Sequence, residues 1–187
     1  MLRLFISINC DEKTKERLIA VQEKIKAQSE KGNFSRPENL HLTLVFLGET
    51  PEDRVPLISE SINEALSSCP PSFTLAFTKT GFFRHSNKNL WLIGAMPNEP
   101  SLSILYDIRT RITNGLSLKN INFDSRQFNP HITLGREIKH SNPIIIPEQK
   151  IVYPVNRISL MKSERISGVL TYSEMYGQDL YEQKTVT

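Results

Sequence analysis

Cysteine is scarce in this chain, and long apolar runs are missing. Cys10 and Cys69 are the only cysteines among 187 residues. Two thiols cannot complete a zinc site by themselves and are too few for a disulfide framework. The apolar start over residues 2–8 is short and Asp11 follows it closely, which fits neither a secretory signal nor a membrane span. We therefore expect a cytoplasmic protein that makes no contact with a membrane.

The chain also lacks a large excess of charge of either sign. Lys and Arg total 23, Asp and Glu total 20, and the formal net charge is +3. This charge is too small for a nucleic-acid coat protein, although it is compatible with an anionic substrate. A content of 39% apolar and 23% charged residues is typical of a globular chain. With no biased linker, the length predicts a single domain over residues 1–187.

Hydrophobic periodicity predicts a mixture of strands and helices. The expected strands are 2–9, 40–47, 73–77, 90–95, 131–135, 144–146, 157–162 and 170–176. The expected helices begin at Asp11, Thr50 and Ser101, and end signals follow the first two at Gly32 and at Cys69-Pro70-Pro71. Because segments 73–77 and 90–95 have the pattern of a hairpin, which belongs to an antiparallel sheet, we expect the α+β class rather than a doubly wound parallel sheet.

Two short segments of the chain repeat each other. Asn39-Leu40-His41-Leu42-Thr43-Leu44 is echoed by Asn129-Pro130-His131-Ile132-Thr133-Leu134. Only four histidines exist in the sequence, and two of them open the same H-[LI]-T-L pattern. Coincidence is a poor explanation for this agreement, so we interpret the pair as one duplicated motif.

The spacing within the motif predicts a polar groove lining. Residues i and i+2 of a strand point to the same face, so each histidine shares a face with its threonine while the apolar residues face the core. If a pseudo-twofold axis relates the two strands, both imidazoles flank one point. Displacement at phosphorus needs a base for the nucleophile and an acid for the leaving oxygen, and imidazole can serve as either. Threonine hydroxyls can donate to the non-bridging phosphate oxygens.

This scheme needs no metal, no cofactor and no covalent intermediate. A two-histidine metal site is a weaker interpretation, since no third and fourth ligands stand at a fixed spacing. His85 and His140 lie outside the repeat, and we expect structural or surface roles for them. Cys10 and Cys69 have the character of small core residues.

The chain resembles the two-histidine phosphoesterase superfamily. Within it, the sequence is similar to the bacterial and archaeal RNA 2′,3′-cyclic phosphodiesterases, also called 2′–5′ RNA ligases. The resemblance lies in the two H-x-T-x motifs and in Arg3-Leu4-Phe5-Ile6, Val45-Phe46-Leu47-Gly48-Glu49, Asn89-Leu90-Trp91-Leu92, Gly135-Arg136, Leu160-Met161-Lys162-Ser163, Gly168 and Tyr172. It thus spans nearly the whole chain, although only the histidine motifs are highly specific.

This resemblance implies a bilobal fold, in which two pseudo-symmetric antiparallel sheets line a central groove and helices lie outside. It implies hydrolysis of an RNA terminal 2′,3′-cyclic phosphate to a 2′-phosphomonoester, with His41 as the acid and His131 as the base. These two roles can exchange, and the reverse reaction, ligation of a 5′-hydroxyl end, would exchange them. The partner is an RNA 3′ end or oligonucleotide that carries the cyclic phosphate, and the enzyme is expected to be a monomer.

Arg136 and Phe46 each lie five residues after a motif histidine. The resemblance implies that Arg136 binds phosphate and that Phe46 stacks on a base, in keeping with their charge and aromatic character. Strict alternation, however, places a residue at an odd offset on the face opposite its histidine. Either a bulge or a strand end redirects these side chains, or Phe46 belongs to the core.

Two other functions are compatible with the same residues. One is a phosphodiesterase for a small cyclic nucleotide or for an ADP-ribose cyclic phosphate, which only the shape of the pocket would distinguish. The other is a non-catalytic RNA-binding module. Histidine and threonine are intact in both copies of the motif, which argues against the binding module.

Overall fold

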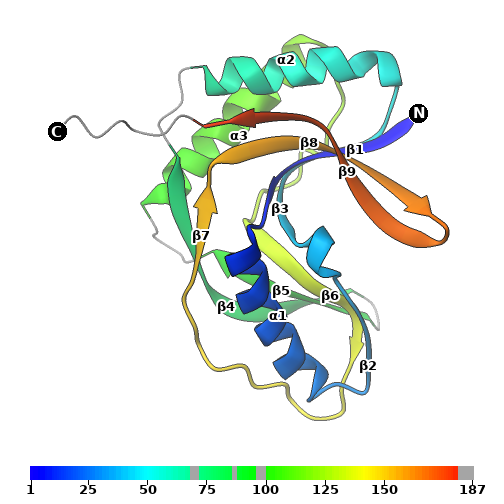
Figure 1. The fold of residues 1–187 in the computed structure, drawn as a ribbon, viewed down its shortest axis with the longest axis vertical. Coiled ribbons are helices and arrows are strands. Elements are labelled where there is room, and N and C mark those ends of the chain that lie inside the picture. The colour runs from blue at the N-terminus through cyan, green and yellow to red at the C-terminus, as the bar shows by residue number, and fades with distance from the viewer. Residues whose placement is uncertain (68–71, 86–87, 96–99, 181–187) are drawn as a thin grey trace.

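A curled antiparallel sheet dominates the computed structural model, which describes residues 1–67, 72–85, 88–95 and 100–180 (Figure 1). Within these ranges the strands are β1 (Leu2–Asn9), β2 (Lys31–Phe34), β3 (His41–Thr50), β4 (Phe73–His85), β5 (Lys88–Ala95), β6 (His131–Lys139), β7 (Ile151–Val155), β8 (Arg157–Ile166) and β9 (Val169–Asp179). Their order is β7-β4-β5-β6-β3-β1-β8-β9, with β2 paired to β6. Every recorded pairing is antiparallel, so the α+β prediction is confirmed.

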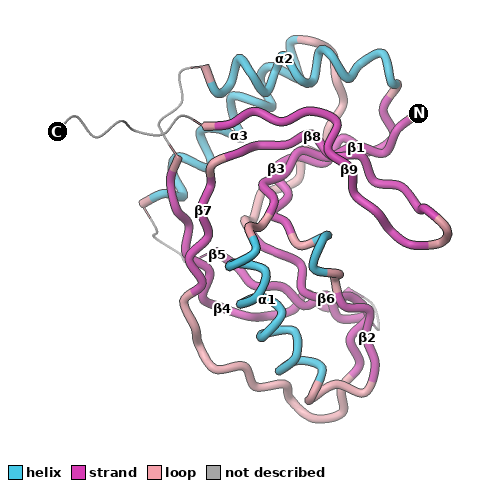
Figure 2. Tube along the Cα trace, in the orientation of Figure 1, coloured by secondary structure: helices cyan, strands magenta, loops and turns pink. Residues whose placement is uncertain are grey.

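The sheet consists of two halves that meet at one point. One half contains β7, β4, β5, β6 and β2, the other contains β3, β1, β8 and β9, and the recorded link between them is the pair Leu42–Ile132. The two sheets expected from the sequence are therefore two lobes of one hydrogen-bonded sheet. The bilobal arrangement is confirmed, and the trace in Figure 2 shows the two halves as separate groups of strands around β3 and β6.

The helices pack outside the sheet, as expected. They are α1 (Glu12–Lys26), α2 (Val55–Leu66) and α3 (Ser101–Leu118), with 3-10 turns at Pro37–Asn39 and Glu52–Arg54. Helix α1 contacts β2, β6 and β7, whereas α2 lies against β8, β9 and α3 (Figure 1). The helices bury an apolar face against the sheet, since Leu18, Val21 and Ile25 of α1 and Leu105, Ile108 and Ile112 of α3 have no exposed surface. None of the helices in the described ranges could cross a membrane.

Several predicted element boundaries are wrong. Helix α1 already ends at Lys26, and Gly32 lies inside strand β2, where a side chain would collide with Ile138. The strand expected at 144–146 is irregular, and the chain forms β7 only from Ile151. Cys69-Pro70-Pro71 and the turn between β4 and β5 lie outside the described residues. The organisation of residues 1–187 as a single domain stays a prediction.

Candidate active site

The two motif strands meet side by side at the centre of the sheet. Leu42 of β3 pairs with Ile132 of β6, and both are fully buried. This antiparallel register sets His41 opposite Thr133 and Thr43 opposite His131, so the two histidines are diagonal neighbours. Diagonal neighbours in a regular ladder stand about 7–8 Å apart. All four polar residues are half-buried on one side of the sheet, which we call the histidine face.

Each imidazole is oriented by the same local hydrogen bond. Nδ1 of His41 lies 2.7 Å from the carbonyl oxygen of Asn39, and Nδ1 of His131 lies 2.7 Å from that of Asn129. A carbonyl oxygen only accepts, so Nδ1 is the donor in both rings, and Nε2 is left as the nitrogen that can exchange a proton. In His41, Nε2 stands 2.9 Å from the Thr43 hydroxyl.

Burial favours the neutral form of His41. Loss of hydration lowers its pKa from 6.5 to about 4, and Arg136 and His131 act in the same direction, against the hydrogen bond to Asn39. Phe5 supplies part of this environment, with ring centroids 4.9 Å apart, and Tyr172 lies edge-on at 5.3 Å.

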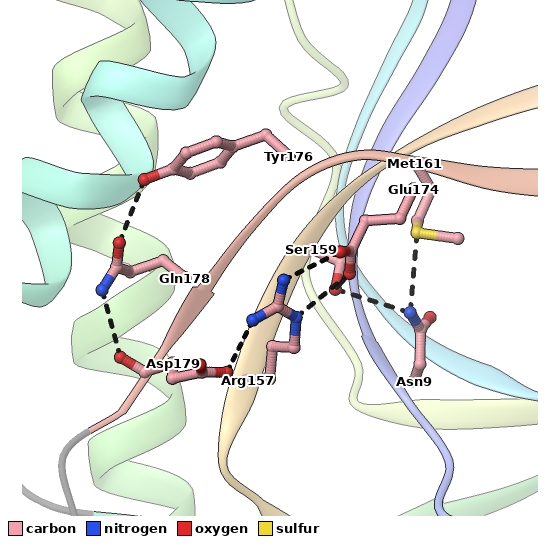
Figure 3. Close-up of polar contacts among 8 residues, drawn as sticks. All are labelled: Asn9, Arg157, Ser159, Met161, Glu174, Tyr176, Gln178 and Asp179. Carbon is pink, nitrogen blue, oxygen red and sulfur yellow. Dashed lines mark hydrogen bonds and ion pairs between the residues drawn. The ribbon is translucent and has the colours of Figure 1, made fainter.

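The histidine face continues from His41 as a polar network on β1, β8 and β9 (Figure 3). Asn9 pairs across strands with His41, and its amide lies 3.5 Å from the Ser159 hydroxyl. Ser159 donates to Glu174 at 2.6 Å, and Arg157 binds both Glu174 and Asp179 at 2.8 and 2.7 Å. Arg157 lowers the pKa of Glu174. These contacts tie β9 to β8 and so fix the strand that carries Tyr172.

A β-bulge occurs at the same place in both motif strands. In β3 the register skips Leu44, since Ser7 pairs with Thr43 and Ile6 with Val45. In β6 it skips Leu134. Both strands then share one burial pattern, in which two consecutive buried residues precede an exposed one. The extra residue restores the residue five after each histidine to the histidine face.

The bulges explain how Phe46 and Arg136 can lie on the same face as the histidines despite their odd offset. Both side chains are exposed on the histidine face rather than packed behind it. Phe46 is 51% exposed, so the interpretation of this residue as core is wrong. Its ring centroid lies 6.3 Å from that of Phe5, beside His41.

A side chain from a helix donates a hydrogen bond to the carbonyl of each bulge residue. The buried amide of Gln22 in α1 donates to Leu134 and Ser35, both at 2.8 Å. In the other motif, Nε of Arg109 in α3 donates to the carbonyl of Leu44 at 3.1 Å. The carbonyl of Leu134 also accepts from the backbone N–H of Ser35 at 3.0 Å, so Gln22 adds a second contact that links this bulge to α1.

We expect Gln22→Leu to destabilise the protein and to lower turnover. The substitution removes a buried donor from two carbonyl groups, which costs about 1–3 kcal/mol of unfolding free energy. Urea unfolding and steady-state kinetics measure the two effects. Gln28→Leu is the matched control, because its amide lies in an exposed position beyond the same helix. Equal losses in the two variants would contradict a specific role for Gln22.

An open groove of about 850 Å³ runs past the motifs. Its lining includes three of the predicted site residues, His41, Thr133 and Arg136. His131, Thr43 and Phe46 are not part of this lining. Thr43 contacts His41 of this lining, and the ring centroid of His131 lies 6.4 Å from that of Phe83, another lining residue.

Sequence patterns missed part of the groove. Arg36, Phe83 and Arg165 line it, yet each lies outside the repeat, and an isolated arginine or phenylalanine carries no signal of function by itself. Tyr172 entered only through the family resemblance. No group of three His, Cys, Asp or Glu side chains is placed to hold a metal ion in the portion of the chain that the structure describes.

Comparisons with known proteins agree on one family. The model for LigT-like phosphoesterases matches residues 8–91. The RNA 2′,3′-cyclic phosphodiesterase of Thermotoga maritima is 28% identical over 183 residues, 97% of this chain and 94% of that protein. The protein of the same name from Methanocaldococcus jannaschii is 36% identical over 138 residues, 72% of this chain and 71% of that protein.

A solved structure shares the fold. Escherichia coli LigT complexed with 3′-AMP matches with a TM-score of 0.76 and 26% identity, over 97% of this chain and 99% of that one. The match extends through both lobes and both motif strands.

Proposed function

Since the chain belongs to the LigT-like phosphoesterase family, we propose that it hydrolyses the 2′,3′-cyclic phosphate at an RNA end to a 2′-phosphomonoester. One observation carries the proposal. The two motif strands pair at Leu42–Ile132, and identical Nδ1 contacts orient both imidazoles. The site therefore provides two proton-transfer groups around one position, as in-line displacement requires.

The reaction forms one bond to phosphorus and breaks another. Water attacks the cyclic phosphate while His131 takes its proton, and the bond from phosphorus to the 3′-oxygen breaks as His41 donates a proton to that oxygen. The 2′-oxygen keeps the phosphate. In ligation a 5′-hydroxyl takes the place of water, so His131 again takes the proton of the nucleophile and His41 again protonates the leaving 3′-oxygen. The exchanged roles expected from the sequence apply to the reverse reaction, which cleaves the 2′–5′ bond.

His41 must be protonated to act as an acid, and a bound substrate favours its protonated form. Burial lowers its pKa to about 4. A bound phosphate anion opposes the charge of Arg136 and so raises this pKa. Once Nε2 of His41 is protonated, it no longer accepts a hydrogen bond from Thr43, and the Thr43 hydroxyl is released to donate to phosphate.

The remaining candidate residues bind the substrate. Thr43 and Thr133 donate to the non-bridging oxygens, Arg136 pairs with the phosphate, and Phe46 stacks on a base. Both imidazoles come from one chain, so we expect a monomer to be sufficient, acting in the cytoplasm on an RNA 3′ end.

An end-group analysis tests the proposed reaction. An oligonucleotide that ends in a 2′,3′-cyclic phosphate is incubated with the protein in the presence of EDTA, and the products are separated. We expect a 2′-phosphate end, because the bond to the 3′-oxygen breaks. A 3′-phosphate end, or turnover only after a metal ion is added, would contradict the proposal.

A further inference from the structure

Building on the proposed function, we propose that Arg36 and Arg165 form a second phosphate subsite in the groove. It binds the phosphodiester adjacent to the terminal cyclic phosphate. The enzyme therefore prefers an oligonucleotide to a nucleoside 2′,3′-cyclic phosphate.

The groove extends beyond the reacting phosphate. Its volume of about 850 Å³ is at the upper end of the roughly 300–1,000 Å³ found for small-molecule sites. His41 and Thr133 line it together with the hairpin β8–β9 and the turn at residues 36–39. There is thus room for more of the RNA chain than the nucleotide between the histidines.

Arg165 lies farther along the β8–β9 hairpin than the position of Tyr172, the hairpin residue that contacts His41. Tyr172, which contacts His41, pairs with Ser163, and Arg165 pairs with Leu170. Two residues along a strand share a face and advance about 6.6 Å. This advance is comparable to the spacing of neighbouring phosphates in an extended single strand.

A hydrogen bond brings Arg36 to the same stretch of the groove. Arg36 precedes the 3-10 turn Pro37–Asn39, and the side-chain amide of Asn39 donates to the carbonyl of Leu170 at 3.0 Å. Since Leu170 pairs with Arg165, this bond ties the turn to the hairpin beside the second arginine. Two guanidinium groups from segments distant in the sequence therefore line the same part of the groove wall.

Both guanidinium groups keep donors available for an anion. Arg36 has one acidic neighbour in the recorded contacts, Glu38 at 3.4 Å, and its side chain is 53% exposed. Arg165 donates from one nitrogen to the carbonyl of Gly168. A guanidinium carries five N–H donors, and its planar fork fits the oxygens of a phosphate.

The composition of the groove favours a nucleic acid over another anion. Three arginines line it, and Glu137 is the one carboxylate among the described lining residues. Phe83 is 52% exposed and lies in the same lining as Tyr172. Aromatic surfaces between cationic groups are typical of sites that bind a single strand by stacking and backbone contacts.

The test compares two substrates in one double variant. kcat/KM is measured for uridine 2′,3′-cyclic phosphate and for a short RNA oligonucleotide with the same cyclic end, over a range of salt concentrations. The wild type is expected to favour the oligonucleotide. In Arg36→Gln/Arg165→Gln the ratio of the two values should fall by about tenfold or more, because two charge-assisted contacts are lost. The salt dependence of the oligonucleotide reaction should weaken too.

Arg17→Gln/Arg111→Gln is the matched control, since it removes the same charge from the outer faces of α1 and α3. The substrate ratio should stay at the wild-type value in this control. A wild type without a preference, or an Arg36/Arg165 variant with an unchanged ratio, would overturn this inference alone. No hydrolysis of either substrate by the wild type would overturn the proposed function and this inference together.

Discussion

His41→Ala and His131→Ala should each lower kcat for a nucleoside 2′,3′-cyclic phosphate by about 10²–10⁴-fold, the usual contribution of a positioned acid or base. In the proposed mechanism, each substitution removes one of the two groups that transfer protons during the displacement at phosphorus. The assay contains EDTA, and circular dichroism and thermal unfolding verify the fold. Both residues are half-buried rather than part of the core, so we expect the fold to persist.

His140→Ala is the control for these variants, because His140 lies outside the repeat and beside Trp91 and Phe82. The double variant should lose little more than the worse single variant, since acid and base work as a unit. Wild-type activity in either single variant would contradict paired acid–base catalysis.

Arg136→Gln should lower kcat/KM by about 10²–10³-fold, the range seen when one donor to a developing anion is removed. It should also raise the pKa of His41 above its value of about 4, because the charge of Arg136 contributes to lowering that pKa. An NMR titration of the imidazole nitrogens measures this change directly. The combination of lower activity and a higher pKa distinguishes a charged partner in the site from a residue that only supports the fold.

Arg136→Lys separates charge from geometry. Lysine keeps the positive charge but lacks the planar fork. We therefore expect a pKa of His41 close to that of the wild type, together with activity between wild type and Arg136→Gln. A His41 pKa that is unchanged in Arg136→Gln would contradict the electrostatic link between the two motifs.

Local patterns predicted most strands and most of the buried apolar residues of each helix, because burial on one face imposes a period of two or 3.6 residues. They failed where tertiary contacts decide the structure. Gly32 looks like a helix end, yet β2 pairs with a strand about a hundred residues later, and only that pairing makes the segment a strand. Likewise β7 depends on its pairing with β4.

The candidate site was predictable where the chain repeats itself. His41 and His131 each open a copy of the repeated motif, and the two strands pair at Leu42 and Ile132, which are equivalent positions of the two copies. The bulges at Leu44 and Leu134 could only be suspected from the odd offset of Phe46 and Arg136. The donors that hold them, Gln22 and Arg109, come from helices distant in sequence. No spacing rule identifies such partners.

The hydrogen bonds that support the two bulges also couple the two lobes. Helix α1 connects to β1, in the lobe of β3, but its Gln22 donates to the motif strand of the other lobe, and Arg109 of α3 does the reverse. Each lobe is therefore stabilised by a helix that follows a strand of the other lobe. A movement of one lobe relative to the other would break these two contacts and disturb both bulges together.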